Sequence, residues 1–309
     1  MISHITIVLI ILLAILLLIN EFFVKVVNKD SISSHILRNS RIKHDSIAIG
    51  STYCRYAISD VDNGMLNLGI NGQFFYYTDK FLRHYAPQTL KPGGIVYIIC
   101  ADLVFAREGR GMYGPEKYIG LLTKEELGDD YSTLGFLKYR FPLIFNPLRL
   151  KSVVGFLVRG SNKSFEATTI NPMTEEEVLA FSIKRCVSWC KQFELNDTIS
   201  SDLPVSIKNE FIKTRHLLNR MIDYCLQSGY KPILVVTPLC GIMNRLIGDD
   251  FIDSILYSNI KEANSQGVQF LDYLRDKRFD DYRLYDKSGD CLNARGRKLF
   301  TEILIKDTL

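Results

Sequence analysis

The stretch 46-SIAIGST-52 decides the fold, because a short apolar run leads directly into a turn of glycine and two hydroxyl residues. A run of this kind is typical of a strand that is buried on both faces and ends at a loop. Further bounded apolar runs predict four more strands, at 65–70 (MLNLGI), 95–100 (IVYIIC), 233–237 (ILVVT) and 268–271 (VQFL).

Helical patterns lie between these strands. Thr174 and Glu177 form a capping-box signature, and an apolar stripe follows at Leu179, Ile183, Cys186, Val187 and Cys190. A second stripe over 211–225 stops at Gly229, and 294–306 predicts a last helix. The alternation predicts an α/β fold, namely a flavodoxin-like three-layer sandwich with a mostly parallel five-stranded sheet.

Parallel sheets of this class bind ligands at the carboxyl ends of their strands. The sequence places polar or glycine-containing turns at four such ends. They are Gly50–Thr52, Asn71–Gly72, Asp102 and the loop around Asp290.

The N-terminus carries a separate apolar segment. Residues 5–19 (ITIVLIILLAILLLI) contain no charge, and 22–27 extend the run to the roughly 20 residues that a bilayer core requires. Neither a basic leader nor a small-residue cleavage site accompanies it, so we expect an uncleaved transmembrane helix rather than a signal peptide. The predicted organisation is an anchor at 1–28, a linker at 29–45, and an α/β domain at 46–309 with an insertion at 107–171.

The composition argues against several classes of function. A formal charge of +4 over 309 residues is too small to indicate a nucleic-acid-binding protein. The 7 cysteines are odd in number and form no C-x-x-C pair, which predicts neither a disulfide framework nor a zinc site. No metal or nucleotide motif occurs, so we expect no cofactor.

The insertion is basic and aromatic. Between Tyr131 and Phe165 there is no Asp or Glu, whereas basic residues occur at Lys138, Arg140, Arg149, Lys151, Arg159 and Lys163. Phenylalanines and a tyrosine are interleaved with them. Three interpretations stay open: a grip on an anionic glycan, a membrane-surface segment, or a helical cap with a solvated basic face.

Four blocks of sequence resemble the SGNH (GDSL-like) hydrolase superfamily. They are 47-IAIGST-52, 67-NLGINGQ-73, Asp102 after the third predicted strand, and 288-SGDCLNARG-296. The likeness is greatest to the membrane-anchored branch found with bacterial cell-surface polysaccharide and teichoic-acid acylation systems. It extends over residues 46–305 apart from the insertion, and it implies the three-layer fold described above.

The resemblance implies a serine nucleophile, a histidine base and an aspartate that orients the base. In this chain these positions hold Thr52, Cys291 and Ser288, with Asp286 and Asp290 nearby but out of register. Asp102 stands where the family has an amide. The candidate catalytic positions are therefore Thr52, Asp290 and Cys291, and the candidate oxyanion or binding positions are Asn71, Gly72 and Asp102.

Four hypotheses follow from these replacements. In the first, the fold is kept without its chemistry and binds a glycan or a protein of polysaccharide assembly. Alternatively, an acyl esterase or O-acyltransferase would use Thr52 with Asp290 or Asp286 as base. A sulfur-based site would use Cys291 and Cys54, as a thiolate or a disulfide. A domain without any site would serve interaction only.

The two signals for membrane orientation disagree. Lys25, Lys29 and Arg38 follow the apolar segment, and the positive-inside rule then favours a cytoplasmic domain. The resemblance implies the opposite, with the domain outside the cytoplasmic membrane, where surface glycans are modified. We expect a single-pass protein of the cytoplasmic membrane with an extracytoplasmic domain.

Overall fold

The computed structural model describes residues 4–27, 31–59, 64–110, 114–159, 174–196, 198–286 and 289–308. These residues form two compact units. The anchor unit comprises Met1–Asn39 and Gly114–Ala167, and the sheet unit comprises Ser40–Tyr113 and Thr168–Leu309. Each unit is described separately below.

The sheet unit is built on five parallel strands in the order β2-β1-β3-β4-β5. This is the flavodoxin-like strand order. All five predicted strands are confirmed, and the α/β class with them. The strands are β1 (His44–Ile49), β2 (Met65–Asn67), β3 (Leu90–Cys100), β4 (Lys231–Val236) and β5 (Phe270–Asp272).

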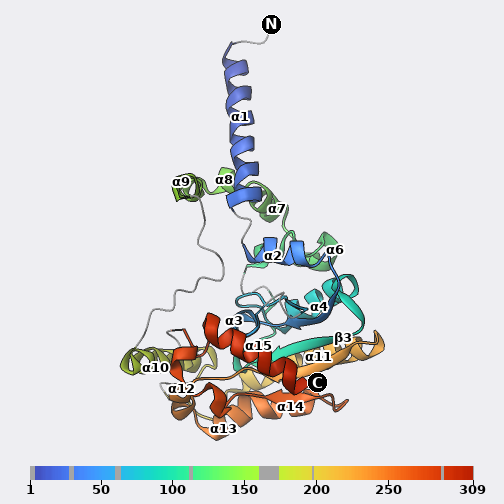
Figure 1. The fold of residues 1–309 in the computed structure, drawn as a ribbon, viewed down its shortest axis with the longest axis vertical. Helices are drawn as coiled ribbons and strands as arrows, with labels where there is room; N and C mark the ends of the chain where they lie inside the picture. Colours follow the sequence, from blue (N-terminus) through green and yellow to red (C-terminus); the bar gives the residue numbers. More distant parts are fainter. Residues whose placement is uncertain are drawn as a thin grey trace. The chain divides into compact units, whose positions relative to one another are not determined.

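Helices cover both faces of the sheet (Figure 1). The chain steps from β1 outward to β2, then back past β1 to β3, and right-handed crossovers place helices from opposite steps on opposite faces. Accordingly α4 (Phe75–Thr89), α11 (Val205–Gln227) and α14 (Ser258–Ala263) pack side by side, and α3 (Thr52–Ala57) packs against α15 (Ala294–Thr308). The remaining elements of this unit are α5 (Asp102–Ala106), α10 (Glu175–Gln192), α12 (Gly241–Leu246), α13 (Asp249–Ile252), η5 (Asp253–Tyr257), η6 (Lys277–Phe279) and η7 (Tyr282–Leu284).

The predicted helix boundaries hold where capping residues set them. The Thr174 hydroxyl accepts from the Glu177 N–H, and the Glu177 carboxylate accepts from the Thr174 N–H, which starts α10 as a capping box. Helix α11 ends at Gln227, and Gly229 follows the C-cap residue Ser228 with a φ of +75°, a conformation that glycine adopts without strain.

The buried face of α10 differs from the predicted one. Of the apolar stripe expected to face the core, Cys190 is buried and Cys186 is half-buried, but Leu179, Ile183 and Val187 are 42%, 47% and 47% exposed. The buried row contains Val178, Ser182 and Trp189 beside Cys190. Both rows have helical spacing. A hydrophobicity pattern does not detect the buried row, because its central residue is the polar Ser182. Close packing against Gly289 requires a small side chain at this position.

Among the described residues of the anchor unit, one helix is long and apolar enough to span a membrane, over His4–Val26 with a mean hydropathy of 3.0. Part of the segment 29–45, expected to be a linker, is helical. Most of the described insertion belongs to the same unit as the apolar helix. The elements are α1 (His4–Phe22), η1 (Phe23–Val27), α2 (Ile32–Asn39), η2 (Pro115–Tyr118), α6 (Lys124–Leu127), η3 (Gly128–Asp130), α7 (Thr133–Arg140), α8 (Pro142–Phe145), η4 (Pro147–Arg149) and α9 (Leu150–Arg159).

Candidate functional site

The loop after β2 is fixed by a fully buried asparagine. The Asn67 amide donates to the Cys54 carbonyl at 3.1 Å and to the Ile58 carbonyl at 2.9 Å, while its oxygen accepts from the Gly69 N–H at 2.8 Å. An added Cβ on Gly69 would lie 2.6 Å from the Arg55 nitrogen. These contacts hold the 67–73 block tightly against α3, and the two loops at the ends of β1 and β2 are thereby brought together.

Thr52 and Gly72 meet as a result of this packing. Thr52 is the first residue of α3, directly after the turn that ends β1. The Gly72 N–H donates to the Thr52 hydroxyl oxygen at 3.0 Å. Thr52 is half-buried, and Asn71 beside it is exposed, with its amide donating to the Tyr56 hydroxyl at 3.4 Å. A backbone donor next to a hydroxyl is the arrangement that an oxyanion site uses.

Asp290 lies in a different set of contacts. Its carboxylate is buried, and Oδ2 lies 2.6 Å from Nε of Arg185 on α10. The Tyr53 hydroxyl donates to the same oxygen at 3.3 Å and accepts from Nη2 of Arg185 at 3.2 Å. The three side chains therefore form a closed polar triangle, in which the guanidinium compensates the charge of the carboxylate.

Cys291 is buried beside Asp290. Burial, followed by the nearby carboxylates of Asp290 and Asp286, raises the pKa of the Cys291 thiol well above its ordinary value. A protonated, inaccessible thiol is neither a base nor a nucleophile. All seven cysteines are free, so the disulfide proposed between Cys54 and Cys291 is absent. The Cys54 thiol is also buried and donates to the Asn67 side chain at 3.3 Å.

No described contact joins Thr52 to Asp290. Among the described contacts, those of Thr52 lead to Gly72, and those of Asp290 lead to Arg185, Tyr53 and Cys291. Asp102 is the first residue of α5, directly after β3, as predicted. Ser288 lies outside the described residues, and Asp286 uses its backbone to close the loop through the Cys291 carbonyl at 2.8 Å.

Helix α10 closes the carboxyl ends of β3 and β4. Trp189 is fully buried there, against Tyr53, Cys100 and Thr237. The space left among these side chains is a cavity of about 10 Å³. That is roughly the volume needed for one water molecule, so a sugar or an acyl chain cannot enter at this point. The sequence patterns missed Tyr53, Arg185 and Trp189, because only the packing of α10 onto the sheet brings them to the site.

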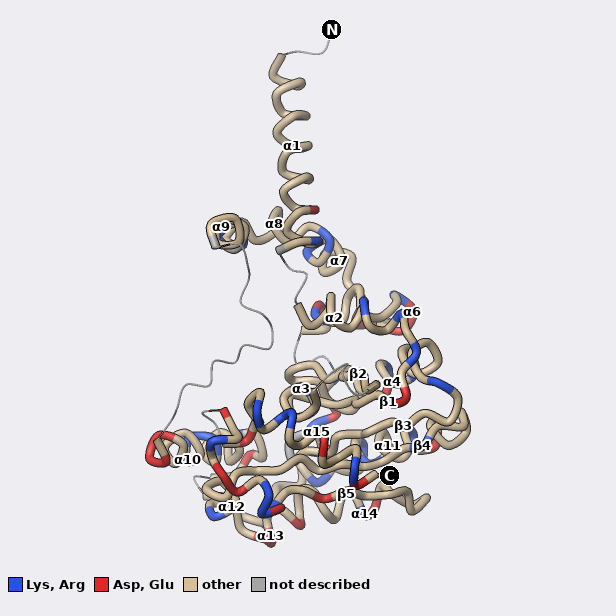
Figure 2. Tube along the Cα trace, in the orientation of Figure 1, with Lys and Arg blue, Asp and Glu red and all other residues tan. Residues whose placement is uncertain are grey.

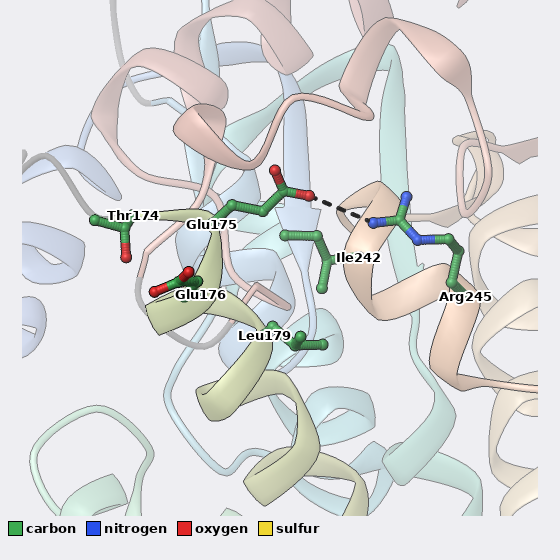
Figure 3. Close-up of a pocket in the computed structure, with 6 residues that line it drawn as sticks. All are labelled: Thr174, Glu175, Glu176, Leu179, Ile242 and Arg245. Atoms are coloured by element: carbon green, nitrogen blue, oxygen red, sulfur yellow. Dashed lines mark ion pairs between the residues drawn. The ribbon is translucent and has the colours of Figure 1, made fainter.

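A pocket of about 500 Å³ opens between the N-terminal turn of α10 and α12 (Figure 3). Leu179 and Ile242 supply its apolar side chains, and Glu175, Glu176 and Arg245 its charges. The Glu175–Arg245 ion pair spans 3.8 Å and both side chains are largely exposed, so it contributes little stability. With two carboxylates against one guanidinium, this pocket is poorly suited to an anionic glycan.

No protein-family model matches this chain, and no curated protein matches it. The SGNH-like interpretation therefore rests on the four sequence blocks. Within the described residues, no group of three or more His, Cys, Asp or Glu side chains is arranged to hold a metal ion.

The Cys291 thiol is expected to resist alkylation in the folded chain. Its raised pKa keeps the reactive thiolate scarce, and its burial denies access to the reagent. The pKa of Cys186 is also raised, to about 11, but this residue is only half-buried. Iodoacetamide at mildly alkaline pH, followed by peptide mass spectrometry, should label Cys186 first and Cys291 only after unfolding.

The raised pKa also sets the direction of a pH effect. Because the unfolded chain loses the Cys291 proton first, the free energy of unfolding should fall as the pH rises above about 8.5. A Cys291→Val variant should show a shallower fall. In the alkylation experiment described above, labelling of Cys291 ahead of Cys186 in the folded chain would contradict a buried, protonated Cys291 thiol and would support the sulfur-based hypothesis.

Proposed function

We propose that this chain is a membrane-anchored SGNH-like protein of cell-surface polysaccharide assembly or modification, which binds a glycan or a protein partner and does not hydrolyse an ester. The observation that carries the proposal is the closed triangle of Asp290, Arg185 and Tyr53. A general base must present a lone pair within hydrogen-bond reach of its nucleophile. The carboxylate nearest the family's base position is instead paired with a guanidinium.

Within the four sequence blocks, the residues that match the family and those that differ from it have different roles. Asn67, Gly69 and Gly296 hold loops through buried hydrogen bonds or close backbone contacts, and these residues match the family pattern. The positions that differ are the three that would carry out acyl transfer and Asp102, where the family has an oxyanion-binding amide. Such a division is expected when a fold is kept for binding after its chemistry is lost.

The membrane placement is part of the proposal. The apolar helix over His4–Val26 supports a single-pass anchor in the cytoplasmic membrane. We place the sheet unit outside that membrane because the resembling proteins work on surface glycans. An impermeant maleimide applied to intact cells decides the orientation. In a Cys186→Ser background, which removes the half-buried native thiol, Lys261→Cys on an exposed helix position should be labelled if the unit is outside.

Loss of the Thr52 hydroxyl is expected to leave ester hydrolysis unchanged. The full chain in detergent would be assayed with a p-nitrophenyl acyl ester, comparing wild type with Thr52→Ala and Cys291→Ala. Since Thr52 lacks a base among its described contacts, all three rates should equal the rate of the denatured chain. Thr52→Ser is the matched control, because it keeps the hydroxyl and removes only the methyl group.

An active acyl esterase or O-acyltransferase is the second candidate, and the Gly72 N–H beside the Thr52 oxygen favours it. In that case Thr52 would attack the acyl carbonyl, and Gly72 would stabilise the oxyanion. Turnover that disappears in Thr52→Ala but survives in Thr52→Ser would establish this candidate and refute the non-catalytic proposal.

A further inference from the structure

The insertion helices pack against one end of the apolar helix α1. We call the segment 133–159, comprising α7, α8, η4 and α9, the collar. Its Leu143 and Val153 form a small buried core with Phe23, and Phe156 contacts the ring of Phe22 edge-on with the centroids 5.9 Å apart. The collar is therefore attached to α1 by side-chain packing within the anchor unit.

Polar contacts fix the same junction. The fully buried Asn20 of α1 donates to the Arg140 carbonyl at 3.0 Å and accepts from the Leu143 N–H at 3.3 Å. Arg140 also pairs with Glu21 at 2.6 Å. Asn20 thus forms hydrogen bonds with backbone groups where α7 ends and α8 begins. These bonds fix the position of the collar along the axis of α1.

The outer surface of the collar combines large apolar side chains with positive charge. Its exposed apolar residues are Leu134, Phe136, Leu137, Ile144, Phe145, Leu148, Leu150, Val154, Leu157 and Val158. Lys138, Arg149 and Lys151 are exposed among them. The collar has no acidic residue, so Figure 2 colours only Lys and Arg on α7 and α9.

The position of the collar matches the edge of a bilayer. From His4 to Asn20 the helix rises roughly 25 Å, close to the hydrocarbon thickness of about 30 Å. The collar begins where this apolar stretch gives way to Asn20 and Glu21. An apolar surface at that depth would face acyl chains, and lysine and arginine beside it would reach phosphates.

We propose that the collar lies in the membrane interface and binds anionic lipid headgroups, which deepens the anchoring function proposed above and rests on it. Lys138, Arg149 and Lys151 would pair with lipid phosphates while Leu148, Leu157 and Val158 enter the boundary of the acyl chains. A soluble anionic glycan would account for the basic residues but not for leucine and valine exposed to 67–78%.

Depth-dependent fluorescence quenching tests the proposal. The full chain would be reconstituted in phosphatidylcholine–phosphatidylglycerol nanodiscs, with lipids brominated either near the headgroup or deep in the acyl chain. Leu148→Trp and Leu157→Trp report on the collar, and Leu12→Trp reports on α1. The wild type carries Trp189 alone and supplies the background. We expect the shallow bromines to quench the collar tryptophans and the deep bromines to quench Leu12→Trp.

The outcomes separate the collar from the anchor. Quenching of Leu12→Trp without quenching at the collar would leave the anchor intact and refute the interfacial collar, including the case in which another protein covers it. No quenching of Leu12→Trp would refute the anchor itself. Quenching at both sites supports the proposal.

A separate comparison tests whether the basic side chains of the collar bind anionic lipid. When Leu148→Trp and Leu157→Trp are the only changes, omitting phosphatidylglycerol should reduce the quenching of the collar tryptophans, because the anionic lipid attracts the basic side chains. Combining Lys138→Gln, Arg149→Gln and Lys151→Gln should abolish this dependence. The matched control, Lys184→Gln, Lys208→Gln and Lys261→Gln, removes as many charges from the sheet unit and should retain it. Equal behaviour of the two triple variants would overturn the headgroup assignment.

Discussion

Gly296→Ala is expected to destabilise the sheet unit by about 4 kcal/mol or to prevent its folding, a loss at the upper end for single substitutions. A Cβ at this position would lie 2.1 Å from the Leu284 carbonyl oxygen. Backbone cannot rotate away as a side chain can, so either α15 or the 283–285 segment must move. Asn293 ties the same two segments together, donating to the Arg283 and Tyr285 carbonyls and accepting from the Gly296 N–H.

Denaturant unfolding of the full chain in detergent, followed by fluorescence of the single buried Trp189, measures the loss. Alanine ordinarily stabilises a helix relative to glycine by about 1 kcal/mol, so the sign of the effect is informative. Gly248→Ala is the matched control in the same unit, because nothing lies within 4 Å of its added Cβ. Similar losses in both variants would contradict the close approach at Gly296.

Arg185→Met is expected to destabilise the sheet unit by about 3 kcal/mol, since it leaves the Asp290 carboxylate buried without a compensating charge. The Asp290 side chain is 2% exposed, and Tyr53 and the Cys291 thiol would be its remaining described partners. Far-UV circular dichroism should follow this variant, because Arg185 also lies 5.9 Å from the Trp189 ring and its loss would alter the fluorescence.

Asp290→Asn and the double variant complete a cycle. Asp290→Asn should cost less than Arg185→Met, because Arg185 is 26% exposed and water can solvate its charge. The double variant should recover part of the loss. If the losses of the two single variants simply add in the double variant, Asp290 and Arg185 are not coupled, and the ion pair does not hold the Asp290 loop. Asp290 would then be available as a base, and the hydrolase candidate would gain support.

Local signals in the sequence were sufficient for the fold. Five short apolar runs marked the strands, and burial on both faces of a parallel sheet demands runs of that kind. Three of them end at glycine, asparagine or proline, and the other two end at Ala101-Asp102 and at Asp272. The capping box at Thr174 and the glycine at 229 set helix ends through contacts within a few residues. Such signals survive in the sequence because the interacting groups are neighbours along the chain.

The candidate site required more than local signals. Thr52 and Gly72 come together as the block pattern suggested, because Asn67 ties their loops together. Asp290 and Cys291 were expected to face the same pocket. Nothing near them in the sequence shows that Asp290 is paired with Arg185, 105 positions away. The ion pair between Asp290 and Arg185 could therefore not be predicted from the sequence.

By itself, the sequence determined the parallel α/β sheet, the order of its elements and an apolar N-terminal helix of membrane-spanning length, since each follows from periodicity and turn chemistry. Tertiary structure alone decided which face of α10 is buried, how Trp189 closes the strand ends, and that the basic insertion packs on α1. These features depend on shape and charge between distant segments. A hydrophobic pattern ranks the faces of a helix, but only packing selects the one that faces the core.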